Sequence, residues 1–304
     1  LPREEFDEKR VADSIKELQR EFSGNSFHLH TYMGVYEIRD RDEAVSIMVD
    51  KANIAADTIK NNYDCCVAYY DEHLLEISIE QRRLLGEFEP ALQNDEFVMY
   101  LQPQVKRDGA AKGAEALVRW VHPSRGILTP YAFIDILENA GLIYKLDLYI
   151  WEKAAQKLAE WKEKGYGSYH ISVNISTKDF YIIDIYETFT GLINKYGIAA
   201  SNLHLEITET TLMTDFEKNM NIIHKLQGVG FRVEIDDFGS GYSSLNMLKD
   251  ISADVLKIDM GFLRKSENEV KGQDILESII TLAGKIGMDV ITEGVAVSYT
   301  HLTL

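Results

Sequence analysis

The sequence of 304 residues predicts an α/β protein in which a parallel barrel follows a smaller α+β region. From Glu96 onward, short apolar stretches alternate with amphipathic stretches of helical length. This pattern is typical of a parallel sheet, and seven such strands favour a (β/α)8 barrel. Six of the strands carry a polar residue at or near the C-terminal end, which is where the active sites of such barrels form.

The barrel elements follow from the spacing of the apolar residues. Strands are expected at 97–105, 114–120, 170–176, 203–209, 231–239, 254–260 and 288–295. Helical periodicity between the strands is clearest at 143–165 and 271–287.

The residues before the barrel are expected to form a separate α+β domain. Its predicted elements are helices at 14–22 and 42–62, a strand–turn–strand at 26–38 and a strand at 65–71. A charged amphipathic helix at 72–94 connects the two parts. We place the domain boundary within this helix, near residue 85, which gives domains at 1–85 and 86–304.

Composition excludes several classes of protein. Apolar residues make up 45% of the chain, which is enough for a sizeable core, but no apolar run is long enough to span a membrane. The charged start LPREEFDEKR is not a secretory signal. The adjacent Cys65 and Cys66 read as reduced thiols. We therefore expect a cytoplasmic chain without membrane contact of its own, although segments outside it could tether a longer protein.

The net charge of −17 argues against a partner made of duplex nucleic acid, because such binders usually carry a basic footprint. An acidic protein can still bind a small phosphate ligand if metal ions screen its carboxylates.

The stretch VEIDDFGSGYSSL (233–245) ends an apolar strand with the adjacent carboxylates of Asp236 and Asp237. On its own this is an ordinary solvated turn, or else a site where a cation separates two like charges. The other strands favour the second interpretation, because they end in the same way. The polar residues concerned are Glu115, Asn174, Glu206, Asp236 with Asp237, Lys257 and Glu293.

Hard oxygen ligands of this kind suit Mg²⁺ or Mn²⁺ rather than Zn²⁺. The carboxylates outnumber what one ion usually takes, so two ions bridged by Asp236 are expected, an arrangement that supports phosphoryl displacement. Lys257 could orient or deprotonate a water, neutralise a phosphate, or simply pair with a barrel carboxylate. Arg119 suits a phosphate, or an ion pair at the barrel rim.

Six separated motifs resemble the EAL family of cyclic-di-GMP phosphodiesterases. They are EALVRW, SVNIS, LEITE, DDFGSGYSSL, LKID and TEGV, in the family's order and approximate spacing. The resemblance covers about residues 92–295. It implies a variant (β/α)8 barrel whose first strand runs antiparallel to the rest, and metal-dependent hydrolysis of cyclic-di-GMP to linear pGpG with two Mg²⁺ or Mn²⁺ ions.

The resemblance also implies roles for individual residues. The first metal would be bound by Glu115, Asn174, Glu206 and Asp236, and the second would be served by Asp236, Asp237 and Glu293. Lys257 would lie by the attacking water, and Glu209 would hold the DFGSGYSS loop. Gln102 and Arg119 would contact the cyclic dinucleotide.

Both ends of the chain show further features. Residues 1–85 resemble the last part of a GGDEF diguanylate cyclase domain without its signature loop, so no cyclase activity is implied. After Val295 the tail VAVSYTHLTL departs from the family pattern, and the eighth strand with its glutamine is missing. We therefore expect a barrel truncated after about residue 295: the longer parent protein hydrolyses cyclic-di-GMP, whereas this chain folds poorly and has little activity.

Two other functions remain open from the sequence. The first is a non-catalytic cyclic-di-GMP receptor, and the second is a scaffold or dimerisation module without a ligand. The intact metal and lysine positions favour the enzyme. Family barrels often dimerise, so a homodimer is one expected state.

Overall fold

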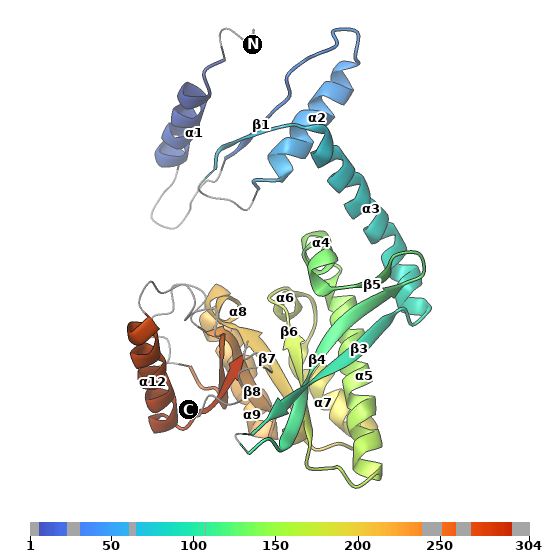
Figure 1. Ribbon diagram of the computed structural model, residues 1–304, viewed down its shortest axis with the longest axis vertical. Coiled ribbons are helices and arrows are strands. Elements are labelled where there is room, and N and C mark those ends of the chain that lie inside the picture. Colours follow the sequence, from blue (N-terminus) through green and yellow to red (C-terminus); the bar gives the residue numbers. More distant parts are fainter. Residues whose placement is uncertain are drawn as a thin grey trace. The chain divides into compact units, whose positions relative to one another are not determined.

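The computed structural model describes residues 6–22, 31–60, 65–106, 108–238, 251–259 and 269–293 (Figure 1). The chain divides into two compact units, Leu1–Glu87 and Phe88–Leu304. Each unit has its own architecture and is described separately.

In the first unit, two short parallel strands pair with each other and pack against a helix. Its elements are α1 (Glu8–Phe22), β1 (Met33–Val35), α2 (Val45–Asp57), β2 (Val67–Tyr69) and the first part of α3 (Glu72–Gln93). Met33 is opposite Val67 in the β1–β2 ladder. Gly34 lets β1 lie directly on α2, because a Cβ at this position would be 1.7 Å from the carbonyl oxygen of Ala52.

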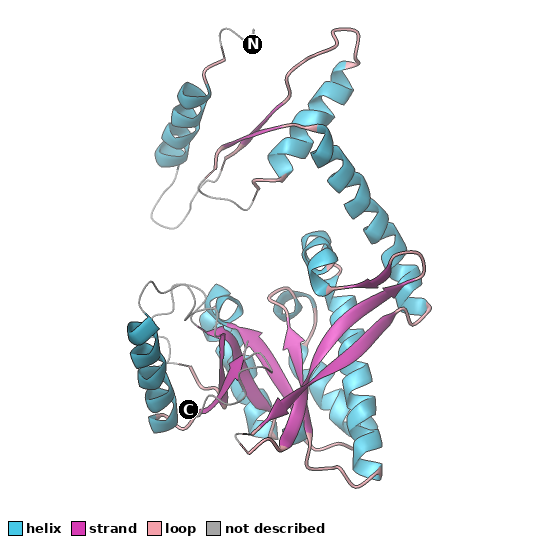
Figure 2. Cartoon of the chain, in the orientation of Figure 1, coloured by secondary structure: helices cyan, strands magenta, loops and turns pink. Residues whose placement is uncertain are grey.

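The second unit is a curled, mostly parallel sheet. Its strands are β3 (Phe97–Val105), β4 (Ala111–His122), β5 (Gly126–Leu128), β6 (His170–Ile175), β7 (Leu203–Thr208), β8 (Arg232–Phe238), β9 (Val255–Asp259) and β10 (Asp289–Glu293). Their order across the sheet is β10-β9-β8-β7-β6-β4-β3, and β5 forms a hairpin on β4. Among the described strands of this sheet, β3 and β5 alone run antiparallel to their neighbour β4 (Figure 2).

Helices cover the outer face of this sheet (Figures 1 and 2). They are α4 (Ile134–Ala140), α5 (Ile143–Glu163), α6 (Asp179–Ile182), α7 (Ile185–Tyr196), α8 (Glu209–Thr214), α9 (Phe216–Val229) and α12 (Glu269–Lys285), with 3-10 turns at Pro130–Ala132 and Ala200–Asn202. This strand–helix alternation is the α/β architecture that the sequence predicts.

Residues of the central strands alternate between an apolar outer face and a polar inner face. In β7, Leu203, Leu205 and Ile207 are fully buried, and His204 and Glu206 between them point to the opposite side. The sequences of β6 (HISVNI) and β8 (RVEIDDF) show the same alternation. The helices therefore bury the apolar set, and the polar set fills the inside of the curl.

The observed strands lie close to the predicted ones, with two differences. The hairpin strand β5 was not predicted: it follows a tight turn and pairs by only three residues. In the segment 26–38, which was expected to form two strands, the described part contains only β1, and residues 26–30 lie outside the described residues. Among the described residues, no helix has the length and apolar content needed to cross a membrane.

Candidate active site

Lys257 lies at the centre of the inner face and contacts four carboxylates at once. Its Nζ is 3.2 Å from Glu115 Oε2, 3.0 Å from Glu206 Oε2, 3.1 Å from Asp236 Oδ1 and 2.8 Å from Glu293 Oε1. The four acids come from β4, β7, β8 and β10, so five of the residues that the sequence singles out lie together. We call these five residues the carboxylate cluster.

The carboxylate cluster is closed on one side and accessible on the other. The side chains of Lys257 and Glu206 are 1% and 0% exposed, whereas that of Glu293 is 33% exposed. Lys257 and Glu115 lie in the middle of their strands, and their long side chains bring the charged groups into the cluster. The opening therefore lies near the strand ends that carry Asp236 and Glu293.

Burial and the neighbouring carboxylates act in opposite directions on the pKa of Lys257. Removal from water would lower the pKa of Lys257, but the four carboxylates, Glu206 foremost, hold this pKa above its ordinary value. Removal from water raises the pKa of Glu206 well above its ordinary value and also raises that of Glu293. Ionisation of all four acids needs more positive charge than one ammonium supplies, which favours a further cation.

The backbone at Asp236 and Asp237 departs from a regular strand. The register between β8 and β9 shifts between Ile235 and Phe238, and Asp237 adopts a positive φ of 55°. Such a conformation is uncommon for residues other than glycine and often marks functional sites. The Asp237 amide donates to Asp236 Oδ1 at 2.9 Å, which fixes the carboxylate that faces Lys257.

Three other predicted site residues lie on the strands of the inner face or directly after one of them. Asn174 is exposed on β6 and pairs in register with Glu206 on β7. Gln102 is exposed on β3 and lies opposite Glu115 on β4, so both side chains share the inner face. Glu209 is partly exposed at the start of α8. The loop that Glu209 was expected to hold lies outside the described residues.

Arg119 follows Glu115 by four residues on β4, so both side chains are on the inner face. Its guanidinium carbon is 5.7 Å from the ring centroid of Tyr100, which is a cation–π contact. Tyr100 is 47% exposed and was not predicted as a site residue. The sequence signal for it was its position two residues before Gln102 on the same strand.

Divalent cations fit the donor set of the carboxylate cluster. Glu206 Oε1 is buried and has no hydrogen-bond partner among the described residues, so one oxygen of a fully buried carboxyl is available as a ligand. The remaining donors are carboxylate oxygens from three other strands. Hard oxygen donors in this number suit Mg²⁺ or Mn²⁺.

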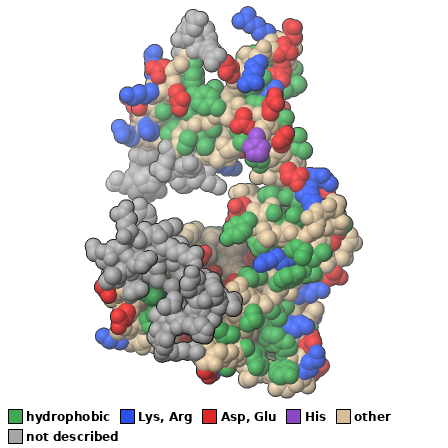
Figure 3. All heavy atoms as spheres, viewed as in Figure 1, with side chains coloured by type: hydrophobic (Ala, Val, Ile, Leu, Met, Phe, Trp, Pro, Cys, Tyr) green, Lys and Arg blue, Asp and Glu red, His purple; other side chains and the backbone are tan. Residues whose placement is uncertain are grey.

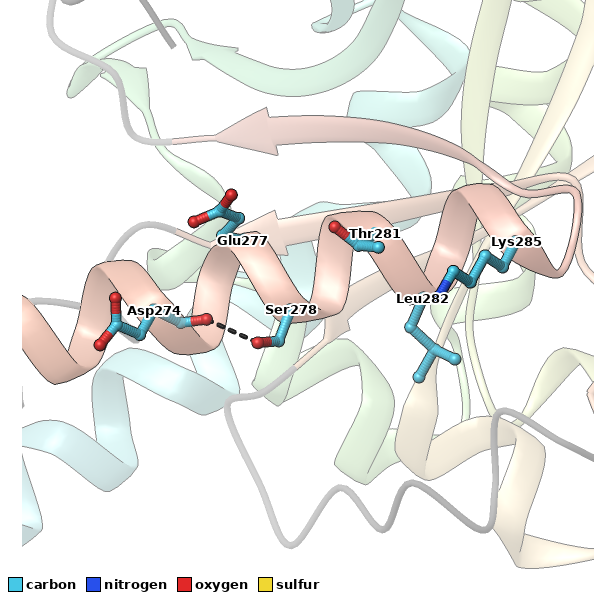
Figure 4. Close-up of a pocket in the computed structure, with 6 residues that line it drawn as sticks. All are labelled: Asp274, Glu277, Ser278, Thr281, Leu282 and Lys285. Atoms are coloured by element: carbon cyan, nitrogen blue, oxygen red, sulfur yellow. Dashed lines mark hydrogen bonds between the residues drawn. The ribbon is translucent and has the colours of Figure 1, made fainter.

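A hollow elsewhere in the second unit has no comparable chemistry. Figure 4 shows that its six lining residues all belong to α12, among them Asp274, Ser278 and Lys285. None of the cluster acids lines it, and Ser278 Oγ is used to donate to the Asp274 carbonyl at 2.7 Å. On the coloured part of the face shown in Figure 3, acidic and basic side chains are interspersed.

The part of the chain that contains these residues matches a known family. Residues 86–301 match the EAL domain model, so the match continues past residue 295, where the resemblance was expected to stop. The chain is 31% identical over 242 residues to MucR of Pseudomonas aeruginosa, a bifunctional diguanylate cyclase/cyclic di-GMP phosphodiesterase. It is 32% identical over 205 residues to the cyclic di-GMP phosphodiesterase PdeR of Escherichia coli.

These alignments cover 79% and 67% of the chain, but only 35% of MucR and 31% of PdeR. The chain thus spans about a third of the length of these relatives. The fold is also similar to a solved structure, the PaMucR phosphodiesterase in complex with c-di-GMP. That comparison gives a TM-score of 0.67 and 32% identity, and covers 72% of this chain and 89% of the other.

Proposed function

This chain belongs to the EAL domain family, and we propose that it hydrolyses cyclic-di-GMP to linear pGpG in a metal-dependent reaction. Because the family match extends to residue 301, we propose this activity for the chain itself and not, as the sequence analysis expects, for a longer parent protein alone. The observation that carries the proposal is the carboxylate cluster, in which four acids from four strands meet around one lysine. Relatives of this chain at about 30% identity are cyclic di-GMP phosphodiesterases, which supports the choice of substrate.

We assign two ions, Mg²⁺ or Mn²⁺, to the cluster and its neighbours. The first ion would be held by Glu115, Asn174, Glu206 and Asp236, and the second by Asp236, Asp237 and Glu293. When bound, such a pair of ions activates a water and stabilises the leaving oxygen of a phosphodiester. The adjacent positions of Asp236 and Asp237, and the carboxylate held by the Asp237 amide, support a bridging role for Asp236.

The remaining side chains bind the substrate and control protons. We assign Lys257 to the attacking water or to a phosphate oxygen, because its Nζ lies 3.1 Å from Asp236 and 2.8 Å from Glu293, the acids at the open side of the cluster. Arg119 and Gln102 lie on the same inner face and are assigned to the phosphate and the base. The exposed Tyr100 ring beside Arg119 offers a stacking surface to a guanine.

Glu209 is assigned to the loop that follows Phe238. It begins α8, directly after Thr208, whose hydroxyl accepts from the Thr211 amide and caps this helix. Thr208 is also in register with Asp236 on the neighbouring strand. The capped helix therefore supports a position for Glu209 next to the strand end that carries the two aspartates.

We also propose that residues 1–85 are the last part of a GGDEF-like domain without cyclase activity, and that the phosphodiesterase domain begins at residue 86. The parallel β1–β2 pair around α2 supports an α+β unit there. A homodimer in solution is proposed from the family resemblance alone, and light scattering of the purified chain tests it.

Incubation of the purified chain with cyclic-di-GMP tests the proposed function. With Mg²⁺ or Mn²⁺ present, chromatography should show conversion to pGpG, and EDTA should stop it. A receptor would bind the dinucleotide and return it unchanged, and a scaffold would not bind it. Either of these two results contradicts the proposal.

A further inference from the structure

Trp151 on α5 is a buried side chain whose polar group the proposed reaction does not use. The residue is 0% exposed, and a buried indole N–H needs an acceptor because leaving it unpaired is costly. Trp151 Nε1 donates to the backbone carbonyl oxygen of Asn174 at 2.9 Å. An indole nitrogen carries one hydrogen and accepts nothing, so this hydrogen bond has one direction and does not depend on any protonation state.

The neighbours of the indole ring hold it in place. Its centroid is 4.4 Å from that of the Phe189 ring on α7, and the two planes are inclined by 38°. Phe189 is also 0% exposed and contacts Phe231 edge to face, with centroids 5.9 Å apart. Rings packed in this way cannot turn without displacing one another. The N–H of Trp151 therefore keeps its direction toward β6.

The hydrogen bond reaches β6 where this strand separates from β4. The ladder between β4 and β6 ends at the pair of Glu115 and Ser172, two residues before Asn174. On its other side β6 stays paired with β7, and Asn174 is in register with Glu206. In the described ladders Asn174 thus has a paired strand on one side, and the indole of Trp151 supplies a further backbone contact.

The carbonyl that Trp151 holds helps to set the direction of the Asn174 side chain. This carbonyl belongs to the rigid peptide plane that follows Asn174. Fixing that plane, together with the pairing to β7, restricts the backbone dihedrals of Asn174 and so the direction of its Cβ. Asn174 is the one exposed residue of β6, so packing holds its side chain less than those of its neighbours on the strand.

We propose that Trp151 is a positioning residue that fixes the backbone of Asn174 so that its side-chain oxygen faces the first metal ion. The inference rests on the metal-dependent function proposed above, in which Asn174 is a ligand. A neutral amide attracts a cation less than a carboxylate does, so its binding depends more on an orientation that is set before the metal arrives. Trp151 comes from the outer side of the sheet and touches neither metal nor substrate in this assignment.

Titration of Mn²⁺ into the full chain by calorimetry, without substrate, tests the proposal. Trp151→Phe keeps an aromatic ring beside Phe189 but has no N–H donor. It should weaken Mn²⁺ binding about tenfold, the lower end of what contacts behind a metal ligand contribute. Asn174→Ala removes the ligand itself and should weaken binding at least as much. The control is Leu158→Ala, a buried residue further along α5, which should lower the melting temperature and leave Mn²⁺ affinity unchanged.

The double variant separates a positioning role from a general loss of structure. If Trp151 acts through Asn174, adding Trp151→Phe to Asn174→Ala should change the Mn²⁺ affinity by less than about twofold. An equal loss in the wild-type and Asn174→Ala backgrounds overturns the inference, because the effect then does not pass through Asn174.

The single variants supply further outcomes that overturn the inference. They are wild-type Mn²⁺ affinity in Trp151→Phe or in Asn174→Ala, a loss in Leu158→Ala as large as that in Trp151→Phe, and a wild-type chain that binds no Mn²⁺. If Trp151→Phe does not fold, Trp151→Met decides by the same results, because methionine also lacks a donor and fills irregular space. A chain that shows the expected Mn²⁺ affinities but leaves cyclic-di-GMP intact contradicts only the proposed function. Hydrolysis by the wild type, with unchanged Mn²⁺ affinity in Trp151→Phe, contradicts only this inference.

Discussion

Replacing Lys257 by methionine tests whether the cluster is organised around a cation. Methionine has a similar length but no charge, so the substitution leaves Glu115, Glu206, Asp236 and Glu293 facing one another without the ammonium that contacts all four. Removing one partner of a buried ion pair typically costs about 3–5 kcal/mol. For a domain of this size each kcal/mol lowers the melting temperature by roughly 2–4 °C, so a loss of about 6–20 °C is expected in EDTA.

Divalent metal should reverse much of this loss. The variant keeps the four carboxylates with less positive charge among them, so Mg²⁺ should bind the folded state more tightly than in the wild type. A ligand at 100 times its Kd stabilises the folded state by about 2.7 kcal/mol. Thermal unfolding followed by circular dichroism, in EDTA and in Mg²⁺, measures both effects.

Lys195→Met is the matched control. Lys195 pairs with Glu152 at 2.6 Å, but its side chain is 61% exposed, so its loss should lower the melting temperature much less than the loss of Lys257 and should not respond to Mg²⁺. Two results would contradict a cluster organised around a cation: equal melting temperatures of Lys257→Met and the wild type in EDTA, or a Mg²⁺ response no larger in Lys257→Met than in the wild type.

Three further predictions concern Lys257, Arg119 and Asp147. Lys257→Ala should lower kcat more than it raises KM, whereas Arg119→Ala should chiefly weaken binding, by about tenfold or more, because a phosphate contact also acts in the ground state; equal effects on both constants in both variants would contradict these roles. Removal from water and the neighbouring Asp179 hold the pKa of Asp147 well above its ordinary value. The folded state therefore keeps a proton that the unfolded state loses above about pH 4, so this group's contribution to stability falls as pH rises. Asp147→Asn, which does not titrate, should gain in melting temperature relative to the wild type between pH 4 and pH 8, and parallel curves for the two proteins would contradict this.

The sequence predicts much of the site because the chemistry follows a simple pattern. Polar residues at strand ends meet at one edge of a parallel sheet, so Glu206, Asp236 and Glu293 could be grouped without coordinates. The contact between Lys257 and Glu115, 142 residues apart, also needs the curl and stagger of the sheet. The bulge at Asp236 and Asp237 depends on the pairing of β8 with β9, which no local pattern reveals.

The sequences of β6 and β7 also predict polar residues inside the curled sheet, but the sequence analysis assigns no role to them. The alternation in HISVNI and LHLEIT places His170 and His204 on the inner face, yet each residue alone resembles an ordinary partly buried histidine. Their rings stack on each other, and this stacking depends on the register of Ser172 with His204 and on the space at Gly113. These are relations between strands, and a single-strand pattern does not contain them.

Cyclic-di-GMP hydrolysis by the wild-type chain and Asp236→Asn, measured side by side with saturating Mn²⁺, tests whether the carboxylate cluster is a metal-dependent active site. Asp274→Asn is the matched control, because Asp274 is an exposed aspartate on α12 away from the carboxylate cluster. Loss of a bridging ligand should cost at least about 100-fold in turnover, the upper end of what loss of a metal ligand's supporting hydrogen bond costs. We expect that loss for Asp236→Asn and wild-type turnover for Asp274→Asn. Wild-type turnover by Asp236→Asn would contradict a metal-dependent site at the carboxylate cluster.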